Sequence, residues 1–182
     1  MNQKVDFKRL EELGRELLLA IGENPDEDRI KDTPHRWAKW WRDFIEHDAG
    51  KVDTAFQSIV ADQMVIVSGM RIWSLCEHHL LPFWCNIAIA YIPKDKVLGL
   101  SKFGRIARAA GSKLQIQERL VQEIALEVHR LTGSENVAVL AQGEHLCMTM
   151  RGARMEAKMT SSVMEGAFRK PEVRAEFLSL VK

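Results

Sequence analysis

The sequence predicts an α+β protein in which an antiparallel ββααββ sheet carries two helices on one face, behind two N-terminal helices. Two observations predict this fold class. Apolar residues recur every three or four positions before residue 50 and again between about 101 and 131, which is the helical period. Pairs of strand-like apolar segments lie before and after the second of these regions, an order typical of α+β folds.

The first 50 residues are expected to form a helical region of their own, followed by one larger domain over 51–182. Leu10, Leu13 and Leu17 share a helical face within about 5–21. Asp32-Thr33-Pro34 then resembles a cap followed by proline in the first turn of a second helix. The apolar face of that helix is rich in tryptophan, which we interpret as core or subunit packing rather than as a ligand site.

The elements of the larger domain follow from changes in period. The segment 83–92 is almost entirely apolar, so we expect that strand to be buried on both faces. Gly133 is expected to end the second central helix. The expected strands are 64–75, 83–92, 137–151 and about 156–163, and the expected helices are about 101–110, 115–131 and 171–181.

Composition excludes several classes of protein. The chain has 182 residues, 46% hydrophobic and 28% charged, with a formal net charge of +1, which is ordinary for a globular protein and low for a nucleic-acid binder. Because the net charge is low, we expect no nucleic-acid partner. Charged residues interrupt the first 19 positions, so we expect no signal peptide, no membrane partner and a cytoplasmic location. Three cysteines argue against a disulfide framework and for metal or thiol chemistry.

Two short motifs suggest a metal site. Cys76 and His79 are three residues apart, so a single turn can direct both at one point. His145 and Cys147, if they lie on a strand as expected, share one face of it. On that interpretation the same face continues to Thr149 and Arg151, while the apolar residues between them face the core: Leu146, Met148 and Met150.

The residue types favour zinc, but the spacing leaves the kind of site open. Thiolate and imidazole ligands suit zinc better than magnesium or calcium. Four protein ligands would close the site and make it structural, whereas three would leave a position for an activated water. Buried cysteines with satisfied histidines are the simplest alternative. Glu77 and His78 favour catalysis, because two more ionisable groups beside a metal cost desolvation energy unless they are used.

A second cluster suggests an anion site. Ser101 is a good capping residue for the first central helix, and Lys102, Arg105 and Arg108 form a basic stripe along it. A helix N-terminus binds phosphate well, although a solvated basic face is the favoured interpretation of the stripe taken alone. Arg151 could converge on the same anion.

Gln117 and Glu118 lie at the start of the next helix. A glutamate there ordinarily complements the helix dipole. The functional alternative is that the amide and the carboxylate recognise guanine through its ring NH and exocyclic amine.

These residues belong to stretches that resemble GTP cyclohydrolase I. The similarity covers nearly the whole chain, and the combined motifs are highly specific. The stretches are AIGENPDEDRIKDTPHR (20–36), SLCEHHLLPF (74–83), AYIPKDKVLGLSKFGRI (90–106), LQIQERLVQEIA (114–125), EHLCMTMRG (144–152) and RAEFL (174–178).

The resemblance implies a tunnelling fold for 51–182 and a homodecamer of two stacked pentamers with active sites between subunits. It implies that GTP and water become 7,8-dihydroneopterin triphosphate and formate, a reaction that begins pterin and tetrahydrofolate biosynthesis. It also implies roles for particular residues: zinc (Zn2+) ligands Cys76, His79 and Cys147; catalytic groups His78, His145, Ser101 and Glu77; and substrate contacts Gln117, Glu118, Leu100, Lys102, Arg105 and Arg151.

Two other classes of function remain as alternatives. One is a non-catalytic, zinc-stabilised assembly module in which all four ligands close the site. The other is a tunnelling-fold enzyme that acts on another purine or pterin, such as a nitrile reductase, which would need a nucleophilic cysteine in its pocket. Cys85 has no role in the family pattern, and we expect it to be a core cysteine in a buried strand.

Overall fold

The computed structural model describes residues 4–57 and 63–182, and these form two compact units. The first ends at Asp48 and the second begins at Ala49. In the first, helices α1 (Phe7–Ala20) and α2 (Thr33–Ile45) are antiparallel neighbours that correspond to the two expected N-terminal helices. They pack closely where Gly14 faces Trp37, since a Cβ at this glycine would lie 3.1 Å from the indole ring.

The second unit is built on a five-stranded sheet in the order β5-β2-β3-β6-β7. All neighbouring strands are antiparallel except β2 and β5. A separate two-stranded sheet joins β1 (Ala55–Gln57) to β4 (Lys96–Leu98). The five strands are β2 (Val65–Cys76), β3 (Pro82–Tyr91), β5 (Leu114–Gln115), β6 (Val137–His145) and β7 (Met159–Met164).

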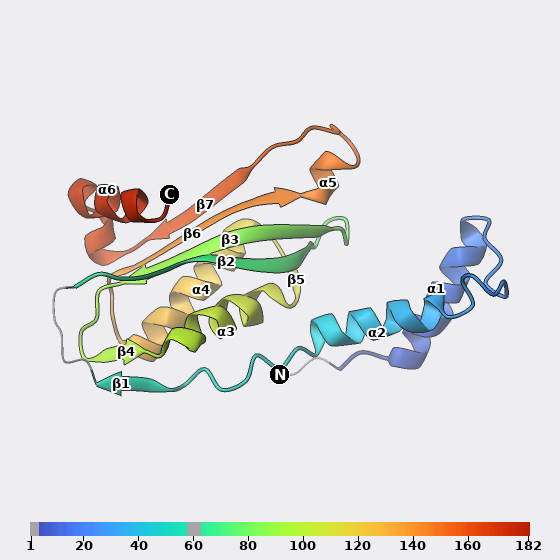
Figure 1. Cartoon of the computed structure of the whole chain (residues 1–182), viewed down its shortest axis with the longest axis horizontal. Coiled ribbons are helices and arrows are strands. Elements are labelled where there is room, and N and C mark those ends of the chain that lie inside the picture. The colour runs from blue at the N-terminus through green and yellow to red at the C-terminus, as the bar shows by residue number, and fades with distance from the viewer. Residues whose placement is uncertain (1–3, 58–62) are drawn as a thin grey trace. The chain divides into compact units, whose positions relative to one another are not determined.

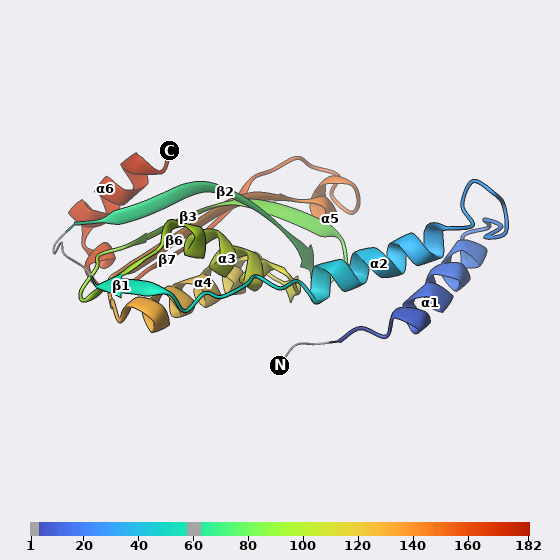
Figure 2. The ribbon, with the colours of Figure 1, turned by 60° about the horizontal axis from the view of Figure 1, so that its bottom comes forward.

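Helices cover the two faces of this sheet unequally. Helices α3 (Leu100–Gly111) and α4 (Gln117–Thr132) lie side by side on one face and build the main core with β2, β3 and β6 (Figures 1 and 2). A 3-10 turn, η1 (Gly166–Arg169), and helix α6 (Pro171–Leu180) pack a smaller core on the opposite face. The structure is therefore α+β, with the two expected central helices on one face.

The topology brings two strand ends together. Both β2 and β6 run antiparallel to β3, which lies between them, so β2 and β6 point the same way. Their C-terminal ends therefore meet at one edge of the sheet, where β2 ends at Cys76 and β6 ends at His145.

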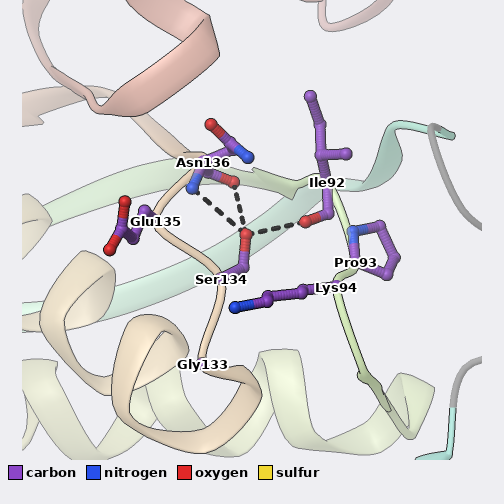
Figure 3. A pocket seen from close by; sticks show the side chains of 7 residues that line it. All are labelled: Ile92, Pro93, Lys94, Gly133, Ser134, Glu135 and Asn136. Atoms are coloured by element: carbon purple, nitrogen blue, oxygen red, sulfur yellow. Dashed lines mark hydrogen bonds between the residues drawn. The ribbon is translucent and has the colours of Figure 1, made fainter.

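At the other end of α4, a cavity of about 370 Å³ lies beside the connection to β6 (Figure 3). Gly133 caps the helix in the left-handed conformation, as expected from the sequence. The Ser134 hydroxyl then donates to the carbonyl of Ile92 at 2.7 Å and accepts from the amide of Asn136. Since α4 has 16 residues, this cavity is about 24 Å along the helix from Gln117.

The expected strand over 137–151 is wrong beyond His145. Leu146–Thr149 form a short helix, α5, closed by the Met150 amide donating to the Leu146 carbonyl at 3.0 Å. His145 and Cys147 consequently do not share a strand face, and Met148 and Met150 are exposed rather than in the core. Local hydrogen bonding overrides the alternating pattern, because the Thr149 hydroxyl donates back to the His145 carbonyl at 2.9 Å.

Ser101 does not cap α3, contrary to expectation. The helix begins one residue earlier, and Gly99 occupies the capping position without a side-chain hydrogen bond. Strands β1, β4 and β5 are too short to be expected from periodicity, and β7 begins three residues later than expected. Within the part of the chain that the structure describes, no helix is both long and apolar enough to cross a membrane.

Gly143 is the glycine on which the sheet depends most closely. It pairs with Cys85, and a Cβ added there would lie 2.0 Å from the Trp84 carbonyl oxygen. We predict that Gly143→Ala lowers the free energy of unfolding by about 3 kcal/mol, the upper end of the usual cost of overpacking, since backbone cannot move aside cheaply. Gly104→Ala is the control, because nothing lies within 4 Å of that exposed helical position and alanine should be neutral or stabilising. Urea unfolding of both variants measures the difference, and equal effects would contradict the prediction.

Candidate metal centre

Three side chains from the two adjoining strand ends form a group that can hold a metal ion. Cys76 is the last residue of β2, His79 lies in the turn after it, and Cys147 lies in α5. One ligand atom from each lies within 4.8 Å of the others. Cys76 is buried and Cys147 is half-buried, so the two sulfurs lie at the boundary between the core and the surface.

Tight turns direct these ligands. The Leu80 amide donates to the Cys76 carbonyl at 2.9 Å, and the His79 amide does so at 3.3 Å. Leu80 takes a positive φ of 54°, an uncommon conformation for a non-glycine residue that reverses the chain directly after His79. As a result, His79 Nδ1 lies 3.6 Å from the Cys76 sulfur.

Cys147 completes the group because α5 replaces the expected strand. A continued strand would have carried residue 147 roughly 6–7 Å beyond His145 along the sheet edge. Burial, and then the nearby Cys76, raise the pKa of the Cys147 thiol, while Arg151 acts in the opposite direction. The structure thus brings together three of the four ligand candidates.

His145, the fourth candidate, makes different contacts. It is not part of the ligand group identified within residues 4–57 and 63–182. Its ring stacks on Phe83 with centroids 4.5 Å apart and planes 5° from parallel. Nε2 lies 3.0 Å from the side-chain oxygen of Gln117. Burial lowers the pKa of His145, and the carboxylate of Glu118 opposes that shift.

Gln117 is buried and its amide is fully engaged by protein groups. The nitrogen donates to the carbonyls of Ala141 and Met159 and to the Ser161 hydroxyl, each at 3.1 Å. The oxygen faces His145 and the Cys85 thiol. The structure therefore gives this side chain a role in joining α4 to β6 and β7.

Glu118, the next residue, is exposed, and its carboxylate is the one that acts on the pKa of His145. It lines a cavity of about 400 Å³ along α4 and β7, a size that suits a small ligand. The other lining residues are Arg119, Val121, Gln122, Ser161, Ser162 and Val163.

Sequence reasoning missed Arg119, which holds Glu77. The Arg119 guanidinium forms an ion pair with the Glu77 carboxylate and donates to the side-chain oxygen of Gln115 at 2.6 Å. Gln115 is buried, and its backbone carbonyl accepts from the Glu77 amide. A usable signal was the spacing of Gln115 and Arg119, which are four residues apart in the helix expected over 115–131, although Gln115 lies in β5 in the structure. His78, in contrast, is exposed, with Nδ1 3.9 Å from the Cys76 sulfur.

The expected anion-binding residues do not converge within one chain. The first half of α3, next to β4, carries Leu100, Ser101, Lys102 and Arg105. The other end of α3 leads to β5 (Figure 1), and β5 pairs with the end of β2 at Cys76. A helix of 12 residues spans about 18 Å, so most of that length separates the two groups. Arg151 lies near the ligand group instead, close enough to Cys147 to lower the pKa of that thiol.

Lys102 and Arg105 are held in place by the chain before β1. Lys102 is largely buried, and its ammonium group donates to the Lys51 carbonyl. The Arg105 guanidinium donates to the same carbonyl at 2.9 Å. Gly50 allows this approach, because a Cβ there would lie 3.1 Å from the guanidinium.

Comparison with known proteins identifies the family. The family model described as GTP cyclohydrolase I matches residues 10–182. This chain belongs to that family. The match includes both strand ends that carry the ligand group, as well as α3 and α4.

Similar proteins cover almost the whole chain. A GTP cyclohydrolase 1 from Alkalilimnicola ehrlichii is 44% identical over 181 residues, which span 96% of this chain and 98% of that protein. A GTP cyclohydrolase 1 from Deinococcus radiodurans is 44% identical over 95% of this chain and 83% of its own length. A GTP cyclohydrolase 1 from Hyperthermus butylicus is 41% identical over 92% of this chain and 86% of its own length.

The ligand group leads to a prediction about metal binding. Cys147→Ala should weaken Zn2+ binding by more than the roughly 10–100-fold that loss of a supporting residue costs. His145→Ala should stay within about ten-fold of the unchanged protein, because its ring bonds to Gln117 instead. Competition with a chelator of known affinity measures both. Equal losses in the two variants would show that His145 is a ligand.

Proposed function

We propose that this chain hydrolyses the imidazole ring of GTP and converts GTP to 7,8-dihydroneopterin triphosphate and formate. Membership of the GTP cyclohydrolase I family and the named relatives make it a GTP cyclohydrolase. The observation that carries the proposal is a Cys-His-Cys group at the strand ends where His145 also lies, with the Glu118 carboxylate close enough to act on the pKa of His145.

The proposal includes the tunnelling fold for the second unit. Residues 51–182 would form the catalytic domain, and the helices within 1–50 would form a separate N-terminal region. Support comes from the four antiparallel strands, the two helices on one face and the division of the chain after Asp48.

Zinc is the metal that we propose for the ligand group. In tetrahedral zinc sites, sulfur and nitrogen ligands lie roughly 3.6 Å apart, and His79 Nδ1 lies 3.6 Å from the Cys76 sulfur. When bound by Cys76, His79 and Cys147, zinc supplies a water acidified towards neutral pH as a nucleophile. With three protein ligands, a position remains for that water, which supports a catalytic site over a structural one.

His145 is proposed to protonate the purine. Carbon 8 of guanine is a weak electrophile, and a proton on the neighbouring ring nitrogen makes it open to attack. Stacking on Phe83 and the hydrogen bond to Gln117 fix the imidazole plane. The ring is therefore already oriented, and the reaction does not pay the entropic cost of orienting it. His78, which is exposed beside Cys76, and Ser101 are proposed to carry protons in the later opening and rearrangement of the ribose.

Glu118 is proposed to recognise guanine. Its carboxylate can accept hydrogen bonds from the ring NH and the exocyclic amine, and it lines a cavity of suitable size. The amide of Gln117 is engaged by protein acceptors, which supports Glu118 as the side chain of this pair that meets the base.

Glu77 is proposed to support the metal ligands. Its carboxylate is held by Arg119, and its amide donates to Gln115. These bonds fix the turn between Cys76 and His79 from the side of α4. A direct part for Glu77 in proton transfer stays a prediction from the sequence.

The separation of the basic residues supports active sites shared between subunits. Leu100, Ser101, Lys102 and Arg105 lie at the far end of α3 from Cys76, so a second copy of the chain would have to present them to the metal group. We propose that they bind the triphosphate and ribose of GTP there, together with Arg151. A homodecamer of two pentamers is the assembly that the family resemblance implies.

Zinc-loaded protein incubated with GTP should release formate and develop pterin absorbance. Glu118→Gln should raise KM for GTP by about ten-fold or more, the effect of losing a charged hydrogen-bond acceptor. Glu127→Gln, the same change farther along α4 at a residue paired with Arg130, should have no effect on KM. Steady-state kinetics measure both. Absence of turnover by the unchanged, zinc-loaded protein would overturn the proposed function.

Mixed assemblies test whether the site is shared. Cys147→Ala and Arg105→Ala should each lower activity by at least about ten-fold, because they remove a metal ligand and an anion contact. In a shared site, one subunit must supply an intact Cys147 and its neighbour an intact Arg105. If the two variants are co-expressed in equal amounts and assemble at random, about one quarter of the sites meet both conditions, so about one quarter of the unchanged activity should be recovered. A mixture no more active than the average of the two variants would contradict a shared site.

A further inference from the structure

Cys85 lies outside the ligand group but is connected to His145 by a buried hydrogen-bonded chain. It is fully buried in β3, and its sulfur lies 3.2 Å from the side-chain oxygen of Gln117. The same oxygen lies 3.0 Å from His145 Nε2. One carbonyl oxygen has two lone pairs, so both contacts can be satisfied together.

The other end of the amide fixes the direction of these bonds. The Gln117 nitrogen faces three groups that can accept: the carbonyls of Ala141 and Met159 and the Ser161 hydroxyl. An amide flipped by 180° would direct its oxygen at two carbonyl oxygens, which cannot donate. The oxygen must therefore face Cys85 and His145, and both of these must donate to it.

The sheet makes room for this thiol. Cys85 pairs with Gly143 on β6, where an added Cβ would lie 2.8 Å from the Cys85 sulfur. Burial raises the pKa of Cys85 to about 12, so the group remains a thiol and a donor. Because the interior excludes water, the thiol is the group that meets the second lone pair of the Gln117 oxygen.

We propose that Cys85 is a positioning residue for the proposed reaction: its thiol holds the Gln117 oxygen in the place where His145 Nε2 donates to it. This bond occupies the Nε2 hydrogen and fixes the ring plane against Phe83, which leaves Nδ1 as the nitrogen that takes up a proton and passes it to the purine. This role rests on the proposed function, because the importance of His145 is taken from it.

Kinetics of three zinc-loaded variants test the role. Cys85→Ala should lower kcat for GTP roughly five-fold, the size of one lost hydrogen bond, with KM within two-fold. Cys85→Ser restores a donor and should recover most of kcat. Ile89→Val is the matched control, because it removes one heavy atom from a buried residue on the same face of β3 and should leave kcat unchanged. An unchanged kcat in Cys85→Ala, a serine variant as slow as the alanine variant, or an equal loss in Ile89→Val would overturn the proposal.

Infrared spectroscopy gives a readout that does not depend on activity. The chain has three cysteines, and zinc holds two of them as thiolates in the proposed site, so the S–H stretching band of the loaded protein belongs to Cys85. Subtracting the spectrum of Cys85→Ser from that of the unchanged protein isolates the S–H band of Cys85 whether or not zinc binds. This band should lie at a lower frequency than that of a free thiol, and in Gln117→Met it should move to the free-thiol frequency. A free-thiol band in the unchanged protein would overturn the proposal even if GTP is turned over, and GTP turnover by that protein tests the proposed function separately.

Discussion

The buried amide of Gln117 is the contact around which the candidate site is organised. An unpaired amide in the core would cost several kcal/mol, on the order of 2–7, and here every polar atom of the side chain has a partner. The bonds fix the first turn of α4 against β6 and β7. Three consecutive residues then diverge, because successive helical positions are about 100° apart. Gln117 points into the core, Glu118 into a cavity, and Arg119 to the turn after β2.

The ligand group depends on rigid strand ends joined to tight turns. Cys76 is fixed by the pairing of β2 with β3 and β5, and the reversal at Leu80 places His79 beside it. Cys147 comes from a separate segment, and it reaches Cys76 only because the chain coils directly after His145. Ligands held by elements of this kind are preorganised, so binding of a metal ion does not have to order them.

Helix α3 separates the basic residues at its N-terminal half from the metal-ligand group near its C-terminal end. Its C-terminal end leads to β5 and Cys76, while its N-terminal half carries Lys102 and Arg105 bound to the carbonyl of Lys51. Those two cations therefore face the chain before β1 rather than the thiols of the same chain. A substrate with a base at one end and a triphosphate at the other is long enough to need both groups, which supports our proposal that a second subunit completes the site.

The sequence by itself determined the elements with strong periodicity and offered the candidate site residues. The central helices, the two long strands, the αL glycine at 133 and a set of four candidate ligands that includes His145 were all predictable, because each depends on local pattern or residue chemistry. Family motifs added the reaction. The structure decided what depends on distant contacts: the coil at Leu146–Thr149, the pairing of Arg119 with Glu77, and the engagement of Gln117 by β6 and β7. Cys85 illustrates the difference, since its burial followed from its strand, whereas its contact with Gln117 spans 32 positions and exists only once the sheet and α4 have packed.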